Sequence, residues 1–330
     1  MKQQIAFLLI FLVAFAAFPA SAIESTKPAP SESDKFDAWL ADFKKDAIVK
    51  GISQNTVDKA LGNAKLVPQI LRLYRKQPEF TMKFSQYIKN VVPKSRIDMA
   101  RIKMAENSAI LDEVSKKYGV QKRFIVALWG IETDFGSKTG AYHIPEALAN
   151  LAYEGRRRDF FSDELLKALQ IIDKKHINAA DLKGSWAGAM GQTQFMPSSY
   201  LLYAEDYDGD GKRDIWGTKQ DVFASIANYL KSVGWNGDAT WGRKVKLPES
   251  FDASWIKQNK TVSEWKSLGV KLRDGSDLPE AGGGVAAMLS MPDGKDGSAF
   301  LVYDNYKIIL KWNRSDYFAT SVGYLSDAIR

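Results

Sequence analysis

The amino-acid sequence predicts a mainly helical protein with a small β-containing lobe. Apolar residues recur at helical spacing from residue 36 to about residue 233. After Trp241 the pattern changes to short β-prone runs separated by turns, which places the lobe at about residues 238–311. With 330 residues, 45% of them hydrophobic, the chain can bury a substantial core. We therefore expect a folded domain over residues 35–330, without internal repeats.

The first residues are typical of an export signal. Lys2 supplies a positive charge, residues 5–18 form an apolar run too short to span a bilayer, and Ala20-Ser21-Ala22 offers small residues for cleavage. We interpret residues 1–22 as a signal peptide that directs the chain to the periplasm, with a single membrane anchor as the alternative. Residues 23–34, which contain several Pro and Ser, follow as a flexible leader.

Composition excludes several kinds of chemistry. The sequence contains no cysteine, so disulfides, thiol catalysis, Cys-ligated zinc and a lipoprotein cysteine are all excluded. Its two histidines, His143 and His176, belong to no HExxH motif, and no GxSxG motif occurs. The formal net charge is +7, and one less once residues 1–22, with Lys2 as their charged side chain, are removed. A basic exported protein suits an anionic partner such as the cell wall or a membrane surface, whereas the lack of a dense Lys/Arg stripe argues against nucleic acid.

Each helix is predicted from the apolar face that it would bury. Phe36, Trp39, Leu40 and Phe43 share one face of the first helix, and Gly51 is suited to end it. Further segments with helical spacing are residues 56–61, 68–75, 97–118, 124–135, 159–173 and 222–233, and a capped helix from Ser315 closes the chain.

The lobe is predicted from β-prone runs that lie between turn residues. Those runs are residues 245–247, 285–289, 299–303 and 307–312. Pro292-Asp293-Gly294 has the residue types of a tight turn, and we expect a second turn at Asp304-Asn305. The last of these strands would end the lobe at about residue 311.

One glutamate on the segment 124–135 is a candidate general acid. Phe124, Leu128, Ile131 and Phe135 form an i, i+4, i+7, i+11 stripe, which indicates a helix packed on a core. Glu132 lies beside that stripe, so its carboxyl is expected to be partly desolvated, which raises its pKa. A general acid at neutral pH needs such a pKa. The alternative is an ordinary helix-end glutamate paired with a Lys or Arg.

Several blocks of sequence resemble a known family. They are ALWGIETDFG (127–136), YEGRRRDFF (153–161), GSWAGAMGQTQFMPSS (184–199), residues 206–216, SIANY (225–229) and KWNRSDY (311–317). In order and spacing they resemble lysozyme-like lytic transglycosylases of the murein transglycosylase B type, in glycoside hydrolase family 103, over roughly residues 85–320. The resemblance implies a lysozyme-like α+β fold and an enzyme that acts on peptidoglycan glycan strands. We expect a monomer, and the sequence identifies no protein partner.

By this resemblance Glu132 is the one acid/base of the reaction. As acid it would protonate the glycosidic oxygen between N-acetylmuramic acid and N-acetylglucosamine. As base it would take a proton from the muramoyl C6 hydroxyl, which leaves a 1,6-anhydro end and needs no cofactor. Glycoside hydrolysis usually needs two carboxylates, and Asp134 would point about 200° away from Glu132 on a helix. Two alternatives stay open: a hydrolytic muramidase that uses water, and a non-catalytic glycan-binding wall protein.

The resemblance also implies polar residues of a substrate cleft. Ser185 and Gln194 match positions beside the catalytic glutamate and can hydrogen-bond sugar substituents. Arg157 and Arg158 match positions where guanidinium groups hold substrate carboxylates, although an Arg run also suits a solvated helix start. The family more often has an aromatic-Gly pair where this chain has Gln192-Thr193, which changes the floor of the groove in a way that the sequence does not define.

Aromatic residues are implied at the same cleft. Tyr87 and Tyr229 match positions that offer flat faces for sugar stacking, whereas residue type alone favours core packing for both. Near the C-terminus Trp312, Asn313 and Tyr317 match residues that complete the cleft. A tyrosine is more usual where this chain has Trp312, so a hydroxyl contact is lost there while stacking is retained.

Residues 206–214, DYDGDGKRD, begin like a calcium-binding loop. In an EF-hand, side-chain oxygens occupy positions 1, 3, 5 and 9, a backbone carbonyl occupies position 7, and position 6 is glycine. The matching ligands here are Asp206, Asp208, Asp210, Asp214 and the carbonyl of Lys212. Gly217 stands where the usual glutamate of position 12 would be, and Asp221 could close a longer loop. We expect a structural Ca²⁺ here, with a plain Asp-Gly turn as the alternative.

Overall fold

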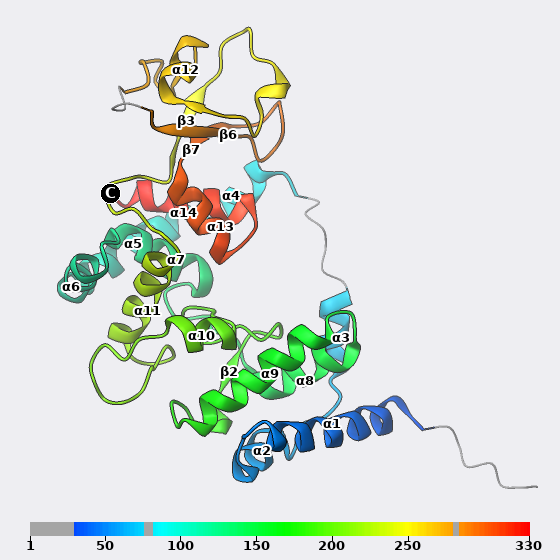
Figure 1. Cartoon of the computed structure of the whole chain (residues 1–330). Helices are drawn as coiled ribbons and strands as arrows, with labels where there is room; N and C mark the ends of the chain where they lie inside the picture. The colour runs from blue at the N-terminus through cyan, green and yellow to red at the C-terminus, as the bar shows by residue number, and fades with distance from the viewer. Residues whose placement is uncertain (1–29, 76–81, 280–283) are drawn as a thin grey trace, which may run out of the picture.

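Helices form most of the chain, and a small sheet caps one end of it, in a computed structural model that describes residues 30–75, 82–279 and 284–330 (Figure 1). The predicted signal peptide, residues 1–22, lies outside the described residues. The leader was predicted to extend to residue 34, but helix α1 (Glu32–Val49) already begins at Glu32, so the predicted leader extends too far. Ser31 and Asp34 form a reciprocal capping box that starts this helix.

The first group of helices contains α1, α2 (Gln54–Leu61), α3 (Pro68–Arg75), α8 (Ile144–Glu154) and α9 (Arg158–Asp173). Helices α8 and α9 pack along each other, and α2 and α3 contact α8. The buried side chain of Asn150 fastens the link between α2 and α3, since it accepts from Val67 N at 2.6 Å and donates to Lys65 O at 2.8 Å. Sequence analysis missed α8 because most of its residues are buried and leave little polar face.

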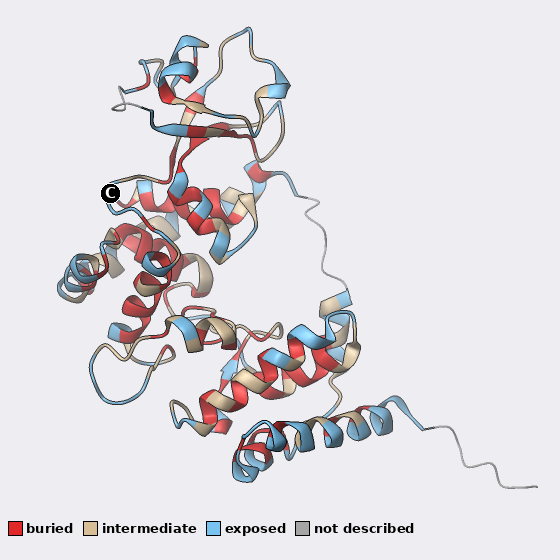
Figure 2. Cartoon of the chain, viewed as in Figure 1, coloured by how far each residue is buried: buried red, intermediate tan, exposed pale blue. Residues whose placement is uncertain are grey.

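The second group surrounds helix α7 (Lys122–Thr133), which is buried from Arg123 to Gly130. Helices α5, α6, α11 and α14 contact α7, and Figure 2 shows α7 and α14 largely in the colour of buried residues. The other helices of this group are α4 (Phe84–Val91), α5 (Lys94–Glu106), α6 (Ser108–Tyr118), α11 (Lys219–Ser232), α13 (Asp304–Trp312) and α14 (Asp316–Ala328). Helix α10 (Pro197–Tyr203) contacts α9 of the first group and α11 of the second.

The prediction of one helix over residues 97–118 is wrong, because α5 and α6 are separate helices that meet at Asn107. The side chain of Asn107 donates to Lys103 O at 2.7 Å and its backbone leaves the helical region, with φ −115°. An Asn side chain that bonds the main chain locally competes with helix continuation.

The lobe is a five-stranded antiparallel sheet in the order β4-β6-β7-β3-β5, with its own apolar core. Its strands are β3 (Gly242–Lys246), β4 (Asn259–Thr261), β5 (Lys271–Leu272), β6 (Ala286–Ser290) and β7 (Ala299–Val302), accompanied by η2 (Ala253–Trp255) and α12 (Val262–Ser267). The predicted turn at Asp293 lies between β6 and β7, where Gly294 takes φ +75°. A second, two-stranded sheet pairs β1 (Tyr142–His143) with β2 (Lys183–Gly184), close to η1 (Ala179–Asp181).

The predicted strand at 307–312 is wrong, because these residues belong to α13. Asn305, Tyr306, Ile308 and Ile309 are its buried residues, and their spacing is that of a helix face rather than of alternating strand positions. The expected turn at Asp304-Asn305 is instead the first turn of this helix. The sheet therefore ends at β7, before the predicted limit of 311. None of the described helices is long and apolar enough to cross a membrane.

Candidate active site

Helix α7 ends abruptly, one residue after Glu132. Thr133 is its last residue, and Asp134, Phe135 and Gly136 all take left-handed backbone angles, with φ of +53°, +59° and +85°. The chain reverses so that the Phe135 ring packs edge-on against Trp129, with ring centroids 5.4 Å apart. The predicted stripe is therefore wrong at Phe135, which lies beyond the helix, and Glu132 stands on the last helical turn.

The Glu132 carboxyl is held in a desolvated position. The residue keeps some solvent access, but the protein surrounds its carboxyl closely enough that burial raises its pKa to about 7. Trp312 Nε1 donates to Glu132 Oε1 at 2.7 Å, which opposes that rise because it favours the charged form. The carboxyl can therefore both give and take a proton near neutral pH.

Trp312 and Tyr87 lie near this carboxyl, and three further aromatic side chains pack against their rings. We call the five residues the aromatic wall: Tyr87, Phe195, Tyr229, Trp312 and Tyr317. The Trp312 ring centroid lies 4.7 Å from that of Tyr229 and 5.2 Å from that of Phe195. The rings of Tyr87 and Tyr317 are 5.2 Å apart. Burial, and in second place the charge of Glu132, raise the pKa of Tyr87, so this ring is close to the carboxyl.

Within the aromatic wall, Tyr229 is packed in the core, which was one of its two interpretations, and Phe195 is an addition to the predicted residues. Tyr229 is only 8% exposed and its hydroxyl donates to Lys311 O at 2.8 Å, so it packs behind Trp312 rather than offering a free face. Phe195 was not predicted as a site residue, although it directly follows Gln194 in a block of family resemblance.

Ser185 and Gln194 lie on the segment that packs against the loop after α7. Gln194 Nε2 donates to Thr139 O at 3.1 Å, and a side chain at Gly140 would clash with the backbone at Gly184 and Ser185. Ser185 Oγ accepts from Ala189 N at 3.1 Å and so closes a tight turn. Both residues are half-buried.

Arg157, Arg158 and Asn313 have other surroundings. The Arg157 guanidinium lies 4.1 Å from the ring centroid of Phe160, and Arg158 lines a hollow that α1 also lines. Asn313 Oδ1 accepts from Ser315 N at 3.1 Å and shapes the turn before α14. Among the described residues, none of these three is hydrogen-bonded or ion-paired to Glu132, and their roles in substrate binding stay predictions.

Asp134 is engaged away from Glu132, as sequence analysis expected. Its carboxylate pairs with Lys138 at 2.9 Å and with Arg96 at 3.3 Å. Lys138 first, and then Arg96, hold the pKa of Asp134 below its usual value. No second carboxylate is hydrogen-bonded to Glu132 or to its partner Trp312 in the described part of the chain.

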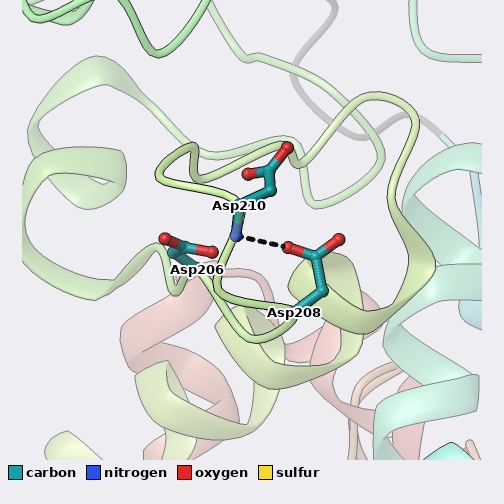
Figure 3. A group of neighbouring side chains, drawn as sticks. All are labelled: Asp206, Asp208 and Asp210. Carbon is teal, nitrogen blue, oxygen red and sulfur yellow. Dashed lines mark hydrogen bonds between the residues drawn. The ribbon is translucent and has the colours of Figure 1, made fainter.

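The acidic loop brings three of its carboxylates together (Figure 3). One oxygen from each of Asp206, Asp208 and Asp210 lies within 4.8 Å of the others, which suits a hard divalent cation. Backbone amides shape this cluster, since Asp206 accepts from Gly209 N at 2.8 Å and from Gly211 N at 2.9 Å.

Asp214 and Asp221 stabilise the loop from outside that cluster. Asp221 is fully buried and accepts from Tyr207 N and from Asp214 N, both at 2.7 Å, so it ties together the two ends of the loop. Asp214 accepts from Trp216 N and Gly217 N, both at 2.9 Å, and fixes the turn before α11. The Lys212 amide donates to Asp210 Oδ1 at 2.8 Å. A calcium ligand role for Lys212, Asp214 and Asp221 stays a prediction.

Comparisons with known proteins agree with this arrangement. The family described as transglycosylase SLT domain matches residues 35–327. The chain is 30% identical over 294 residues to membrane-bound lytic murein transglycosylase B of Escherichia coli strain K12, which covers 84% of this chain and 79% of that protein.

Solved structures also match over most of the chain. SltB3 of Pseudomonas aeruginosa, in complex with NAG-anhNAM-pentapeptide, has a TM-score of 0.87 and 41% identity over 91% of this chain and 80% of that one. The Escherichia coli lytic transglycosylase Slt35, in complex with calcium, has a TM-score of 0.76 and 28% identity over 88% and 92% of the two chains. These similarities confirm the predicted lysozyme-like fold. The chain therefore belongs to the transglycosylase SLT domain family, as a lytic transglycosylase that acts on peptidoglycan.

Proposed function

We propose that Glu132 is the single catalytic carboxyl of this lytic transglycosylase and acts first as acid and then as base. The observation that carries the proposal is a carboxyl with a pKa raised to about 7, bonded by one indole N–H and bordered by the aromatic wall. Near neutral pH about half of such carboxyl groups are protonated, so one group can serve both steps.

The two steps balance without water. Protonated Glu132 gives its proton to the glycosidic oxygen between N-acetylmuramic acid and N-acetylglucosamine, and the bond from C1 to that oxygen breaks. The Glu132 carboxylate then takes the proton of the muramoyl C6 hydroxyl while O6 bonds to C1. The products are a 1,6-anhydro-muramoyl end and a free N-acetylglucosamine hydroxyl, and Glu132 is protonated again. The SltB3 complex, which contains NAG-anhNAM-pentapeptide, supports this product class.

Sugar rings are proposed to stack on the accessible members of the aromatic wall, Tyr87, Trp312 and Tyr317. All three are half-buried, and thus combine fixed position with an accessible surface. Ser185 and Gln194 are proposed to hydrogen-bond the N-acetyl and hydroxyl groups. The proposed roles of Arg157, Arg158 and Asn313 rest on their matching family positions alone.

Two further proposals concern stability and location. Asp206, Asp208 and Asp210 are proposed to hold a structural Ca²⁺, supported by their mutual distances and by the calcium complex of Slt35. The ion would brace the loop before α11 and would take no part in proton transfer. Residues 1–22 are proposed to export the chain to the periplasm, where peptidoglycan lies.

Replacing one carboxyl oxygen tests the catalytic assignment. Glu132→Gln is expected to keep glycan binding but to abolish release of anhydro-muropeptides from purified peptidoglycan, measured by mass spectrometry. Asp134→Asn is the matched control and should retain wild-type release. Reducing ends in place of anhydro ends from the wild type would favour the hydrolytic muramidase, and no products at all would favour the glycan-binding protein. Wild-type release by Glu132→Gln would show that another residue is the acid.

A further inference from the structure

Gln192 joins the last turn of α7 to the end of the acidic loop. Its side chain is buried, with the residue 9% exposed, and both ends of its amide are bonded. Oε1 accepts from Trp129 Nε1 at 2.8 Å, and Nε2 donates to Trp216 O at 2.7 Å. A neutral amide accepts through its oxygen and donates through its nitrogen, so one side chain can bond Trp129 on one side and Trp216 on the other; a Phe ring could do neither, and a Trp ring could only donate.

The backbone of Gln192 extends the same connection. Its carbonyl accepts from Thr133 Oγ1 at 3.1 Å, and its N–H donates to Ile215 O at 2.8 Å. Trp129 lies about one turn before Glu132 and Thr133 directly follows it. Gln192 therefore holds α7 on both sides of the catalytic glutamate while it is anchored to residues 215 and 216.

The position of this end of α7 is set by contacts with other segments. Beyond Thr133 the backbone is left-handed for three residues, and although Asp134 N and Phe135 N bond the carbonyls of Gly130 and Trp129, no regular helix continues past this closed turn to hold it in place. The geometry of Glu132 against Trp312 depends on that turn, because Trp312 comes from a different helix.

The role that we assign to Gln192 rests on the proposed function of Glu132. We propose that Gln192 is a positioning residue for the reaction: by bonding Trp129 and Thr133 it fixes the last turn of α7, so that the Glu132 carboxyl stays against Trp312 and faces the glycosidic oxygen. Gln192 touches neither the carboxyl nor the substrate in this role. Loss of its side-chain bonds leaves Trp129 Nε1 and Trp216 O buried without those partners, which favours a shift of the helix end.

The first test compares two buried amides in the full chain. Gln192→Met keeps the length of the side chain but removes both of its bonds. The matched control Asn150→Leu removes bonds to Lys65 and Val67 from another buried amide, on α8. Both variants are expected to melt at a lower temperature. Gln192→Met alone should lower kcat about tenfold or more, with KM within about twofold, because small displacements of a catalytic group cost up to about 100-fold. Its loss of kcat/KM with rising pH should also begin at lower pH, because a displaced carboxyl is better solvated.

A second readout reports position without relying on activity. In protein labelled with ¹⁵N-tryptophan, nine indole N–H resonances are expected, and Trp312→Phe assigns the one that reports the contact with Glu132. This resonance should move in Gln192→Met and stay in Asn150→Leu. The Trp312 resonance therefore tests whether Gln192 positions Glu132, whereas Glu132→Gln tests whether Glu132 is the catalytic group, so failure of one proposal can be told from failure of the other. An unmoved Trp312 resonance together with wild-type kcat in Gln192→Met would overturn the proposal.

A near-isosteric variant covers the case in which Gln192→Met does not fold. Gln192→Glu in its protonated form can still accept from Trp129 and donate to Trp216 O. Its activity relative to wild type is expected to be near one at pH 5 and to fall about tenfold by pH 8, as the introduced carboxyl loses the proton that it donates. A ratio that does not change between these pH values would contradict the positioning role.

Discussion

The indole N–H of Trp312 lies 2.7 Å from Glu132 Oε1, across 180 residues of sequence. An indole nitrogen can only donate, so the oxygen that it bonds must act as an acceptor. This bond favours the form in which the proton of the acid is on Oε2, the oxygen that Trp312 does not occupy. A tyrosine, which is more usual at this position, could donate or accept a hydrogen bond and would not favour the proton on one particular oxygen.

Trp312→Phe tests this relationship, because it keeps an aromatic ring and removes the donor. The lost hydrogen bond had favoured the carboxylate, so the pKa of Glu132 should rise and the alkaline loss of kcat/KM should move to higher pH. The value of kcat should fall about tenfold as the carboxyl loses its fixed orientation. Trp265→Phe, which removes a buried indole donor in the lobe, is the control. If the alkaline loss of kcat/KM in Trp312→Phe moved to lower pH instead, the hydrogen bond from Trp312 would not be favouring the carboxylate form of Glu132.

The pH dependence of kcat/KM in the wild type should follow the protonation of Glu132, because the proposed reaction starts from its protonated form. With a pKa of about 7, half of the Glu132 carboxyls are ionised at about pH 7. We expect kcat/KM to be level on the acid side, to be halved near pH 7 and to fall about tenfold per pH unit above it. Rates on a soluble glycan substrate at constant ionic strength measure this. A rate that rises through pH 8 would show that the ionised form starts the reaction.

The same carboxyl affects stability with a defined sign. Its folded pKa, about 7, exceeds the value of 4.5 for an unperturbed Glu, so the folded state binds this proton more tightly and stability falls as pH rises between those values. Glu132→Gln removes the cost of a buried charge, at most about 3 kcal/mol. Its melting temperature should exceed that of wild type at pH 8 and equal it at pH 4. A gain of equal size at both pH values would point to packing rather than charge.

Several elements could be predicted from sequence because local residues specify them. Residues 68–75 form α3 as predicted, and α9 begins within one residue of its predicted start. Residue 107 and residues 307–312 were misjudged because a local side-chain bond ended one helix and two adjacent isoleucines resembled a strand. A local hydrogen bond thus decided the first case, and burial of one helix face decided the second.

In the site, too, residues could be predicted from their sequence neighbours, whereas hydrogen bonds between residues far apart in sequence could not. Glu132 was identified from its apolar neighbours and its sequence block, but its donor Trp312 was expected only to stack. Gln192 was noticed as a departure without a role, since its partners Trp129 and Trp216 lie 63 and 24 residues away. Spacing along one helix cannot reveal such contacts.

The acidic loop provides a prediction that is separate from catalysis. A calcium chelator is expected to lower the melting temperature, because bound Ca²⁺ would stabilise only the folded loop of Asp206, Asp208 and Asp210. Asp208→Asn should show a smaller shift on chelation, whereas Asp274→Asn, in an exposed turn of the lobe, should shift as wild type does. No shift in the wild type would indicate a plain Asp-Gly turn.

Asp293 links the lobe to the helix that carries Tyr87. The first residue of α4 has no cap from its own N-terminal neighbour, and the carboxylate of Asp293 accepts instead from Phe84 N, and from Ser85 N at 3.0 Å. Tyr317, a member of the aromatic wall, donates to the same carboxylate at 3.3 Å. Asp293, in a turn of the lobe, thus caps the N-terminus of α4. Its carboxylate also interacts favourably with the dipole of this helix.

Asp293→Ala should therefore lower the free energy of unfolding by about 1–2 kcal/mol, the usual cost of losing an N-cap. Because α4 then loses its anchor, Tyr87 should be less well held and kcat/KM should fall, whereas the pKa of Glu132 should be unchanged, since Asp293 does not contact it. Denaturant unfolding and the pH profile measure the two effects separately. Asp296→Ala, in the same connection and paired with Lys295, is the control. Equal stability of the two variants would mean that the lobe rests on α4 through apolar packing alone, such as the contact of Phe84 with Phe300.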